Sequence, residues 1–342
     1  MKLGLTAAGM GRSVRIDIKL IQEAERLGYD SVWTAEAWGA DAITPLAWIA
    51  AQTSKIHLGT GIMQMPARTP AMCAMQAMTV DQLSGGRLIL GLGPSGPQVV
   101  EGWHGVAYGK PLARTREYIE ILRRIFRREA PLEFSGSEYQ IPFRGEGASG
   151  LGKSLKSILH GRADIPIWTA TISPKGIRTA AEVADGFMPI WTGPGGLDTF
   201  ADDVQAGFAA AGGGKSYETF SVAPLVACVI GEDLQRCRDA VRPQIALYVG
   251  GMGARGKNFY NSHVARQGWP DAAREIQDLY LEGRQREATS KVPDDLVDAI
   301  TLVGPVERIR ERIAEWKQTK IDTLVLSAPS LANVRTMAEI CL

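Results

Sequence analysis

Eight short apolar runs alternate with longer amphipathic stretches along this 342-residue chain. The runs that predict strands are Leu3–Leu5, Ser31–Thr34, Ile56–Ile62, Arg87–Gly91, Pro166–Ala170, Gly186–Ile190, Val222–Ile230 and Thr323–Leu326. The stretches that predict helices are Arg15–Leu27, Ala42–Thr53, Ala71–Leu83, Leu112–Arg128, Lys175–Val183, Asp198–Ala211, Leu234–Leu247 and Val306–Thr319. Such alternation indicates parallel strands joined by crossover helices. Eight units favour an α/β fold of the closed (β/α)8 TIM-barrel type over an open doubly wound sheet, although a count alone does not establish closure.

Two segments of the chain lie outside the eight predicted strand–helix units. Residues 129–164 contain Leu132–Phe134, a Ser-Gly turn and Tyr139–Ile141, which predicts a hairpin followed by a glycine-rich loop. Residues 249–300 begin with a glycine-rich stretch, Gly250-Gly251-Met252-Gly253, and then predict further helices, among them Ala272–Glu282. We expect both to be insertions on the loops of one domain spanning residues 1–342. Because loops at the carboxyl ends of barrel strands build the active site, the second insertion is a candidate helical substrate lid.

Composition excludes several classes of function. The formal net charge is +1, so the protein has no strong overall electrostatic field that would indicate nucleic acid or a membrane surface as its partner. Four cysteines show no Cys-x-x-Cys spacing and four histidines are scattered, which argues against a metal site and fits a reducing compartment. No apolar run approaches the roughly 20 residues that span a bilayer, and the first apolar run is too short for a signal peptide. We expect a cytoplasmic protein.

Two glycine motifs resemble nucleotide-binding loops. Gly147–Ser154 matches the phosphate-binding loop letter for letter, but that motif needs a full helix behind it and Leu155–His160 is too short. Gly91–Gly96 matches Gly-x-Gly-x-x-Gly after a strand, but Pro97 and Gly102 interrupt the helix that should follow. We therefore expect neither nucleotide hydrolysis nor a doubly wound nicotinamide site.

Four motifs carry a resemblance to a known family. Gly59–Pro70 combines a strand that ends Thr-Gly-apolar with a Pro-x-Arg-x-Pro turn, and Asp81–Arg87 reads Asp-Gln-Leu-Ser-Gly-Gly-Arg. Ala184–Gly186 opens a strand with Ala-Asp-Gly, and Leu302–Pro305 reads Leu-Val-Gly-Pro before a helix. Together they resemble the bacterial-luciferase-like superfamily of flavin and deazaflavin oxidoreductases, especially its coenzyme F420-dependent branch. The resemblance spans nearly the whole chain and says least about residues 250–290.

The resemblance implies a cofactor site at the carboxyl ends of the strands. In many relatives the peptide that matches Gly61–Ile62 is a cis bond beneath the central ring of the cofactor. The turn Thr169–Gly176 leads into a helix with Pro174 in its first turn, where free N–H groups favour a phosphate; Ser173 could instead be an N-cap and nothing more. The cofactor-binding residues we expect are Thr34, Gly61, Ile62, Met63, Gln64, Gly93, Ser95, Gln98, Ala170, Thr171, Ile172, Ser173, Lys175, Gly176 and Trp191.

The catalytic group is expected after the second strand. Many relatives carry Asp-His or Glu-His-His there, whereas this chain has Ala35 and Glu36. Glu36 could exchange a proton if apolar neighbours such as Trp38 raised its pKa, so Glu36 and Trp38 are the catalytic candidates. Glu36 could equally contact the ring edge or tie down a loop. His104 fits a loop-anchoring or core histidine better than a catalyst.

Three functions fit this sequence. The first is hydride transfer between carbon C5 of coenzyme F420 and a small organic substrate, for which alcohols, aldehydes, imines and activated alkenes all stay open. The second is an FMN-dependent monooxygenase, and the third is a barrel that binds a flavin or deazaflavin without catalysis. The resemblance also implies a homodimer.

Overall fold

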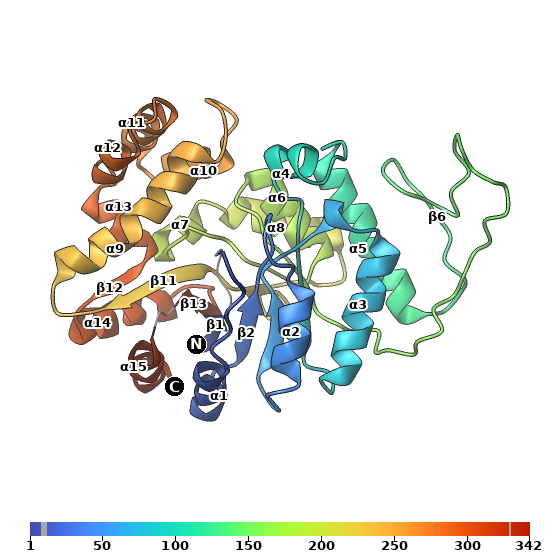
Figure 1. Cartoon of the computed structure of the whole chain (residues 1–342), viewed down its shortest axis with the longest axis horizontal. Helices are drawn as coiled ribbons and strands as arrows, with labels where there is room; N and C mark the ends of the chain where they lie inside the picture. The colour runs from blue at the N-terminus through green and yellow to red at the C-terminus, as the bar shows by residue number, and fades with distance from the viewer. Residues whose placement is uncertain (8–11, 328–329) are drawn as a thin grey trace.

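The computed structural model describes residues 1–7, 12–327 and 330–342 and has an α/β fold built on a curled parallel sheet (Figure 1). The strands of this sheet are β1 (Lys2–Thr6), β2 (Ser31–Thr34), β3 (His57–Thr60), β4 (Met63–Gln64), β5 (Leu88–Gly93), β8 (Ile167–Thr169), β9 (Gly186–Phe187), β10 (Ser221–Val222), β11 (Leu225–Ile230), β12 (Leu302–Gly304) and β13 (Thr323–Ser327). Their order is β10-β9-β8-β5-β3-β2-β1-β13-β11-β12, with β4 beside β5, and every pairing is parallel. The parallel crossover topology predicted from the alternation is therefore confirmed.

Strand pairing brings distant parts of the chain together. The first strand lies between β2 and the late strand β13, with Leu3 opposite Leu324. An isolated parallel bridge joins Ile190, just after β9, to Leu225 at the start of β11. The sheet therefore curls so that strands near its two ends approach one another.

Each of the eight expected strands overlaps an observed strand. The run Val222–Ile230 is divided into β10 and β11 because Pro224 has no N–H to donate to a neighbouring strand. Strand β12 was not among the expected strands; it has only three residues and pairs with β11. The hydrophobic pattern therefore located the eight expected strands, but not the short strand β12 or the interruption at Pro224.

Helices cover the outside of the sheet. They are α1 (Ile18–Leu27), α2 (Ile43–Ala50), α3 (Pro70–Leu83), α5 (Pro111–Arg127), α6 (Pro174–Val183), α8 (Ala201–Ala211), α9 (Leu234–Ala246), α14 (Val306–Lys317) and α15 (Leu331–Cys341). Contacts run from α2 through α3, α5 and α6 to α8, while α15 contacts both α1 and α14. No helix within the described ranges is long and apolar enough to cross a membrane.

Local sequence explains where the helices begin and end. The Asp17 side chain accepts a hydrogen bond from Leu20 N at the start of α1, and Gly28 ends that helix in the left-handed conformation with φ 94°. Thr69 caps α3 in the same way, with Pro70 as its first residue. The helix that Pro97 and Gly102 were expected to interrupt is present as a short one, α4 (Pro97–Gly102), because proline is tolerated in a first turn.

The inside of the curl is filled by side chains. Trp33 and Trp168 stack with ring centroids 5.1 Å apart and belong to a buried cluster with Ile89 and Met188. A Cβ on Gly59 would lie 2.1 Å from the Trp33 ring, so only glycine allows the indole to lie against this strand. The interior is therefore a packed core and not a pore.

A second group of helices follows α9. After a π-helical turn at Leu247–Gly251 come α10 (Phe259–Arg266), α11 (Pro270–Leu281), α12 (Gln285–Ser290) and α13 (Asp294–Ile300). They pack with α9 around a buried cluster of their own, separate from the main core. Figure 1 shows these helices grouped together on one side of the molecule. Helix α11 corresponds to the helix expected at Ala272–Glu282.

The expected hairpin is also present. Strands β6 (Phe134–Ser135) and β7 (Gln140–Ile141) are antiparallel, and Figure 1 shows this segment extending away from α5. Residues 142–166 form neither helix nor strand, so the phosphate-binding match at Gly147–Ser154 has no helix behind it. The motif therefore lacks the helix whose N-terminus holds phosphate in a phosphate-binding loop.

Candidate functional site

The carboxyl ends of three strands meet at one edge of the sheet. Met63 and Gln64 of β4 pair with Leu92 and Gly93 of β5, and Ala170 N, just after β8, donates to Leu92 O at 2.9 Å. Since parallel strands end on the same side of a sheet, the loops that follow them share one region. These are the loops that the sequence places around the cofactor.

The turn between β3 and β4 has the expected backbone. The Gly61–Ile62 peptide is cis. Gly61 N donates to Thr34 O at 2.6 Å, and Glu36 N donates to Ile62 O at 3.2 Å, so the turn is fixed to the end of β2. A Cβ on Gly93 would lie 2.6 Å from Ile62 Cδ1, which shows how closely this turn approaches β5.

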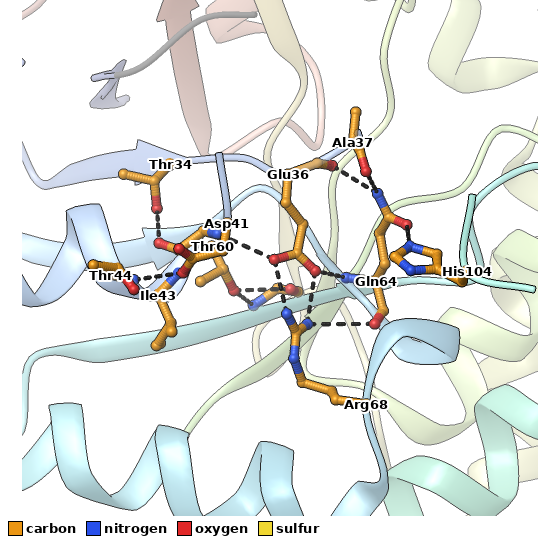
Figure 2. A network of polar contacts seen from close by, with 12 residues as sticks. Thr34, Glu36, Ala37, Asp41, Ile43, Thr44, Thr60, Gln64, Arg68 and His104 are labelled. Carbon is orange, nitrogen blue, oxygen red and sulfur yellow. Dashed lines mark hydrogen bonds and ion pairs between the residues drawn. The ribbon is translucent and has the colours of Figure 1, made fainter. Parts of the chain in front are cut away.

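Glu36 is held by four hydrogen bonds (Figure 2). Arg68 donates from Nη1 to Oε1 at 2.7 Å and from Nη2 to Oε2 at 2.9 Å, while Gln64 N and Ala42 N donate at 2.6 and 3.1 Å. The Glu36 side chain is 6% exposed. Burial opposes the charge of Arg68, but the hydrogen bonds to Glu36 and its negative charge together outweigh burial and raise the pKa of Arg68. The carboxylate ties the end of β2 to the turn after β4.

Gln64 connects this ion pair to a histidine (Figure 2). Its Nε2 donates to Ala37 O at 2.7 Å and to Glu36 O at 3.2 Å, and its Oε1 lies 2.8 Å from Nε2 of His104. Gln64 is 2% exposed, whereas His104, which follows α4, is half-buried. Trp38, the other catalytic candidate, is 49% exposed.

The turn before α6 gathers hydroxyl groups at a helix N-terminus. Ser173 Oγ accepts from Gly176 N at 3.1 Å. A Cβ on Gly176 would lie 2.0 Å from Thr171 Oγ1 and 2.7 Å from Ser173 Oγ, so glycine leaves room for both hydroxyls. Lys175 is exposed, and Arg266 of α10 donates to Ile172 O at 2.7 Å. Hydroxyls, helix N–H groups and two cations suit an anionic ligand.

Other expected cofactor residues lie near this edge in different settings. Thr34 is buried and donates from Oγ1 to Ala42 O at 2.6 Å, so its hydroxyl hydrogen is already used in a hydrogen bond within the protein. Ser95 follows β5 with φ 60°. Gln98 is exposed and lines a shallow hollow of about 450 Å³ on α4 with Pro97, Glu101 and Gly102.

Trp191 packs toward the second helical group. It adopts φ 54° and is 3% exposed in the cluster formed with α9 to α13. Its carbonyl accepts from Gln267 Nε2 at 2.8 Å and lies 3.1 Å from His263 Nε2, both from the segment at and after α10. The Trp191 ring also packs against Tyr248.

Two buried polar atoms at this edge lack a partner within the described residues. They are Thr169 Oγ1 at the end of β8 and the Trp191 indole nitrogen. A buried donor without an acceptor is unfavourable, so such groups usually meet a ligand or water. This arrangement fits a polar ligand bound across the ends of β5, β8 and β9.

The expected site residues do not include four residues of this region: Arg68, His104, Thr169 and Arg266. The sequence indicates His104 only as a loop-anchoring or core histidine, and its contact with Gln64 agrees with loop anchoring. The Pro-x-Arg-x-Pro turn was noticed, but nothing in it names Glu36 as the partner 32 residues earlier. His104 is paired with a residue 40 positions away and Arg266 with one 94 positions away. Only the folded chain reveals such partners.

Comparison with known proteins agrees with this architecture. A family model described as "Luciferase-like monooxygenase" matches residues 5–323. A Mycobacterium tuberculosis protein, assigned by its name to the coenzyme F420-dependent oxidoreductases, is 44% identical over 99% of both chains.

Two solved structures are similar over almost their whole length. The coenzyme F420-dependent tetrahydromethanopterin reductase from Methanopyrus kandleri has a TM-score of 0.80 at 21% identity, covering 99% of this chain and 96% of that one. An F420-dependent secondary alcohol dehydrogenase in complex with an F420–acetone adduct has a TM-score of 0.76 at 18% identity, covering 99% and 97%. The resemblance inferred from the four motifs is confirmed, and the chain belongs to the luciferase-like monooxygenase family.

Proposed function

We propose that this protein is a coenzyme F420-dependent oxidoreductase that transfers a hydride between the deazaflavin C5 and a small organic substrate. The observation that carries the proposal is the 44% identity, over the whole chain, to a protein assigned by name to that class. The two similar structures, whose titles name F420-dependent enzymes, support it. When bound, the deazaflavin supplies the carbon that gives or takes the hydride.

The residues at the sheet edge fit this cofactor. The Gly61–Ile62 turn packs closely against Gly93, where a Cβ would meet Ile62, and the backbone of this turn is the part that we expect to support a flat ring. Thr169 and Trp191 offer buried polar atoms for its heteroatoms.

We place the phosphate at the start of α6, near the hydroxyls of Thr171 and Ser173, with Lys175 and Arg266 as its cations. FMN would use the same groups, so an FMN-dependent monooxygenase is the second candidate, favoured by the name of the family.

We assign Glu36 a positioning role and Trp38 a shielding role. A carboxylate that already accepts four hydrogen bonds has little capacity left to exchange a proton with substrate. Glu36 instead fixes the loop that carries Gln64. Trp38 is half-exposed beside this loop and suits a wall that excludes water from the reacting atoms.

We also propose that the curled sheet closes as a (β/α)8 barrel within one domain of residues 1–342. The bridge between Ile190 and Leu225 supports this, as does the hydrogen bond from Asp322 N to Val222 O at 3.2 Å. Residues 129–164 and 249–300 are then insertions on its loops. The second is the substrate lid, since Arg266 reaches from it to the turn before α6.

We propose a cytoplasmic homodimer. Trp48 on α2 and Met72, Met75 and Leu83 on α3 are all exposed, and these two helices are neighbours. Helix α2 has no charged residue, and the exposed positions of α3 have none either. An uncharged apolar surface of this kind favours binding to the same surface on a second copy of the chain. Light scattering should give twice the chain mass for the wild type and the chain mass for Trp48→Lys combined with Met75→Lys.

The proposed function is tested by titrating the ligand-free protein with F420, FMN and NADP while following their spectra. F420 should bind most tightly. A panel of 2-propanol, propanal, 1-pyrroline and cyclohexenone then samples the four substrate classes with oxidised or reduced F420. Preference for FMN with oxygen consumption would support the monooxygenase, and tight F420 binding without turnover of any panel member would support a barrel without catalysis.

A further inference from the structure

Hydride transfer at a carbon attached to oxygen or nitrogen also moves a proton. Oxidation of an alcohol or amine releases one proton from the heteroatom, and the reverse reaction consumes one. Glu36 already accepts four hydrogen bonds, so a different side chain has to take up or release this proton. Histidine is suited to this exchange near neutral pH.

Of the four histidines, all within the described residues, one has the required position. His57 starts β3 at the opposite end of the strand, and His160 follows the hairpin segment. His263 is 0% exposed and faces Trp191 and Thr192. His104 lies at the carboxyl edge of the sheet, is half-buried, and contacts the loop after β4 through Gln64.

The hydrogen bonds of Gln64 fix the tautomer of His104. Gln64 Nε2 faces two carbonyl oxygens, Ala37 O and Glu36 O, which can only accept. Its Oε1 therefore faces His104, and Nε2 of His104 must carry the hydrogen across the 2.8 Å contact. In the neutral ring Nδ1 then holds a lone pair.

That second nitrogen is available to a ligand. Among the described residues none donates to or accepts from Nδ1 of His104, and Nδ1 is not among the buried atoms without a partner. The ring cannot turn freely, because Gln64 is 2% exposed and its backbone N–H is held by Glu36 at 2.6 Å. Arg68, Glu36 and Gln64 thus form a support for the imidazole.

We propose that His104 exchanges the proton that accompanies hydride transfer, through Nδ1. During oxidation of an alcohol, the O–H bond breaks and its proton forms an N–H bond at Nδ1. The electron pair left on oxygen becomes the second C=O bond as the hydride leaves carbon for the oxidised deazaflavin. In the reverse direction the imidazolium returns the proton to oxygen. The inference rests on the proposed function, and Gln64 is a positioning residue in it.

The first test uses the ligand-free protein. Nitrogen NMR of imidazole-labelled protein, recorded on the neutral ring, should show Nε2 of His104 protonated and Nδ1 unprotonated. Gln64→Leu should lower the fraction of the Nε2-protonated form toward the tautomer mixture of free histidine. A wild-type ring protonated at Nδ1 would overturn the proposal.

The second test measures access to the ring. Diethyl pyrocarbonate should modify His104, and excess F420 should slow this modification by about tenfold or more, as followed by mass spectrometry. His57, whose side chain is 47% exposed, is the control and should react at the same rate with and without F420. F420 that binds without protecting His104 would overturn the inference alone, whereas failure of F420 to bind would overturn the proposed function with it.

The third test uses whichever panel member the wild type turns over. His104→Ala should lower kcat by roughly 100-fold or more, with F420 affinity within about twofold, and added imidazole should restore part of the rate. His104→Gln should be as slow as His104→Ala, because it keeps a polar contact with Gln64 but cannot exchange a proton. Wild-type turnover by His104→Gln would refute the role of His104.

Discussion

Arg68 and Glu36 form a bidentate ion pair at the candidate site, with hydrogen bonds of 2.7 and 2.9 Å between residues 32 positions apart. Their side chains are 13% and 6% exposed. Paired in this way, each charge offsets the cost of burying the other. The pair joins the end of β2 to the turn that carries Gly61, Ile62 and Gln64, so it sets the shape of the site.

Removing one charge should therefore destabilise the fold. In Glu36→Gln the Arg68 guanidinium stays buried without its counter-charge, and we expect a loss of about 3–5 kcal/mol in the free energy of unfolding. Urea denaturation followed by circular dichroism measures the change. Asp271→Asn is the matched control, because its pair with Arg274 is 86% and 69% exposed, and it should change stability by less than about 0.5 kcal/mol.

A double-mutant cycle with Arg68→Gln separates this pair from other effects. The double variant should lose less stability than the sum of the two single variants, since neither buried charge then remains. Additive losses would mean that Glu36 and Arg68 do not act together.

His263 should make stability depend on pH. Its ring is fully buried and stacks on Phe200, and Nδ1 has no partner within the described residues. Burial lowers the pKa of His263 from 6.5 to about 4. Because the unfolded chain binds the proton more readily, the free energy of unfolding should fall as pH drops from about 6.5 to about 4 and then level off. The loss should be on the order of 3 kcal/mol.

Denaturation curves over this pH range check the His263 prediction. His263→Gln has no titrating ring, so its stability should vary less with pH than that of the wild type. Parallel curves for wild type and His263→Gln would contradict the assignment.

The positions of the strands could be predicted from the sequence, whereas most side-chain contacts at the site could not. Each strand is an apolar run flanked by polar turns, and this local pattern survives in the fold. Pairings such as Gln64 with His104 depend on the approach of loops far apart in the chain. The backbone of Trp191, at φ 54°, directs its ring to helices whose positions no local pattern specifies. Local sequence patterns do not identify neighbours of this kind.

Gly91 should not tolerate a side chain. A Cβ at this position would lie 1.8 Å from Thr60 O, a backbone atom that cannot move without separating β3 from β5. We expect Gly91→Ala to lower the free energy of unfolding by more than about 3 kcal/mol or to prevent folding, since overpacking against backbone has no local relief. Gly102→Ala is the control: nothing lies within 4 Å of its Cβ position at the end of α4, and helical alanine should be neutral or slightly stabilising. Equal thermal stability of the two variants would show that β3 and β5 can separate at little cost.

Thr169 offers a test in which stability and cofactor binding should respond differently. Its buried hydroxyl has no partner within the described residues, so Thr169→Val should leave the free energy of unfolding unchanged or raise it by about 1 kcal/mol. If the hydroxyl contacts the cofactor, F420 affinity should fall roughly 3- to 10-fold, as expected for one lost hydrogen bond. Thr60→Val is the control, because Thr60 Oγ1 donates to Gly91 O and accepts from Gly91 N, both at 2.8 Å. That variant should lose about 1–3 kcal/mol of stability, because it leaves buried backbone groups unpaired. Unchanged F420 affinity in Thr169→Val would place the cofactor away from the end of β8.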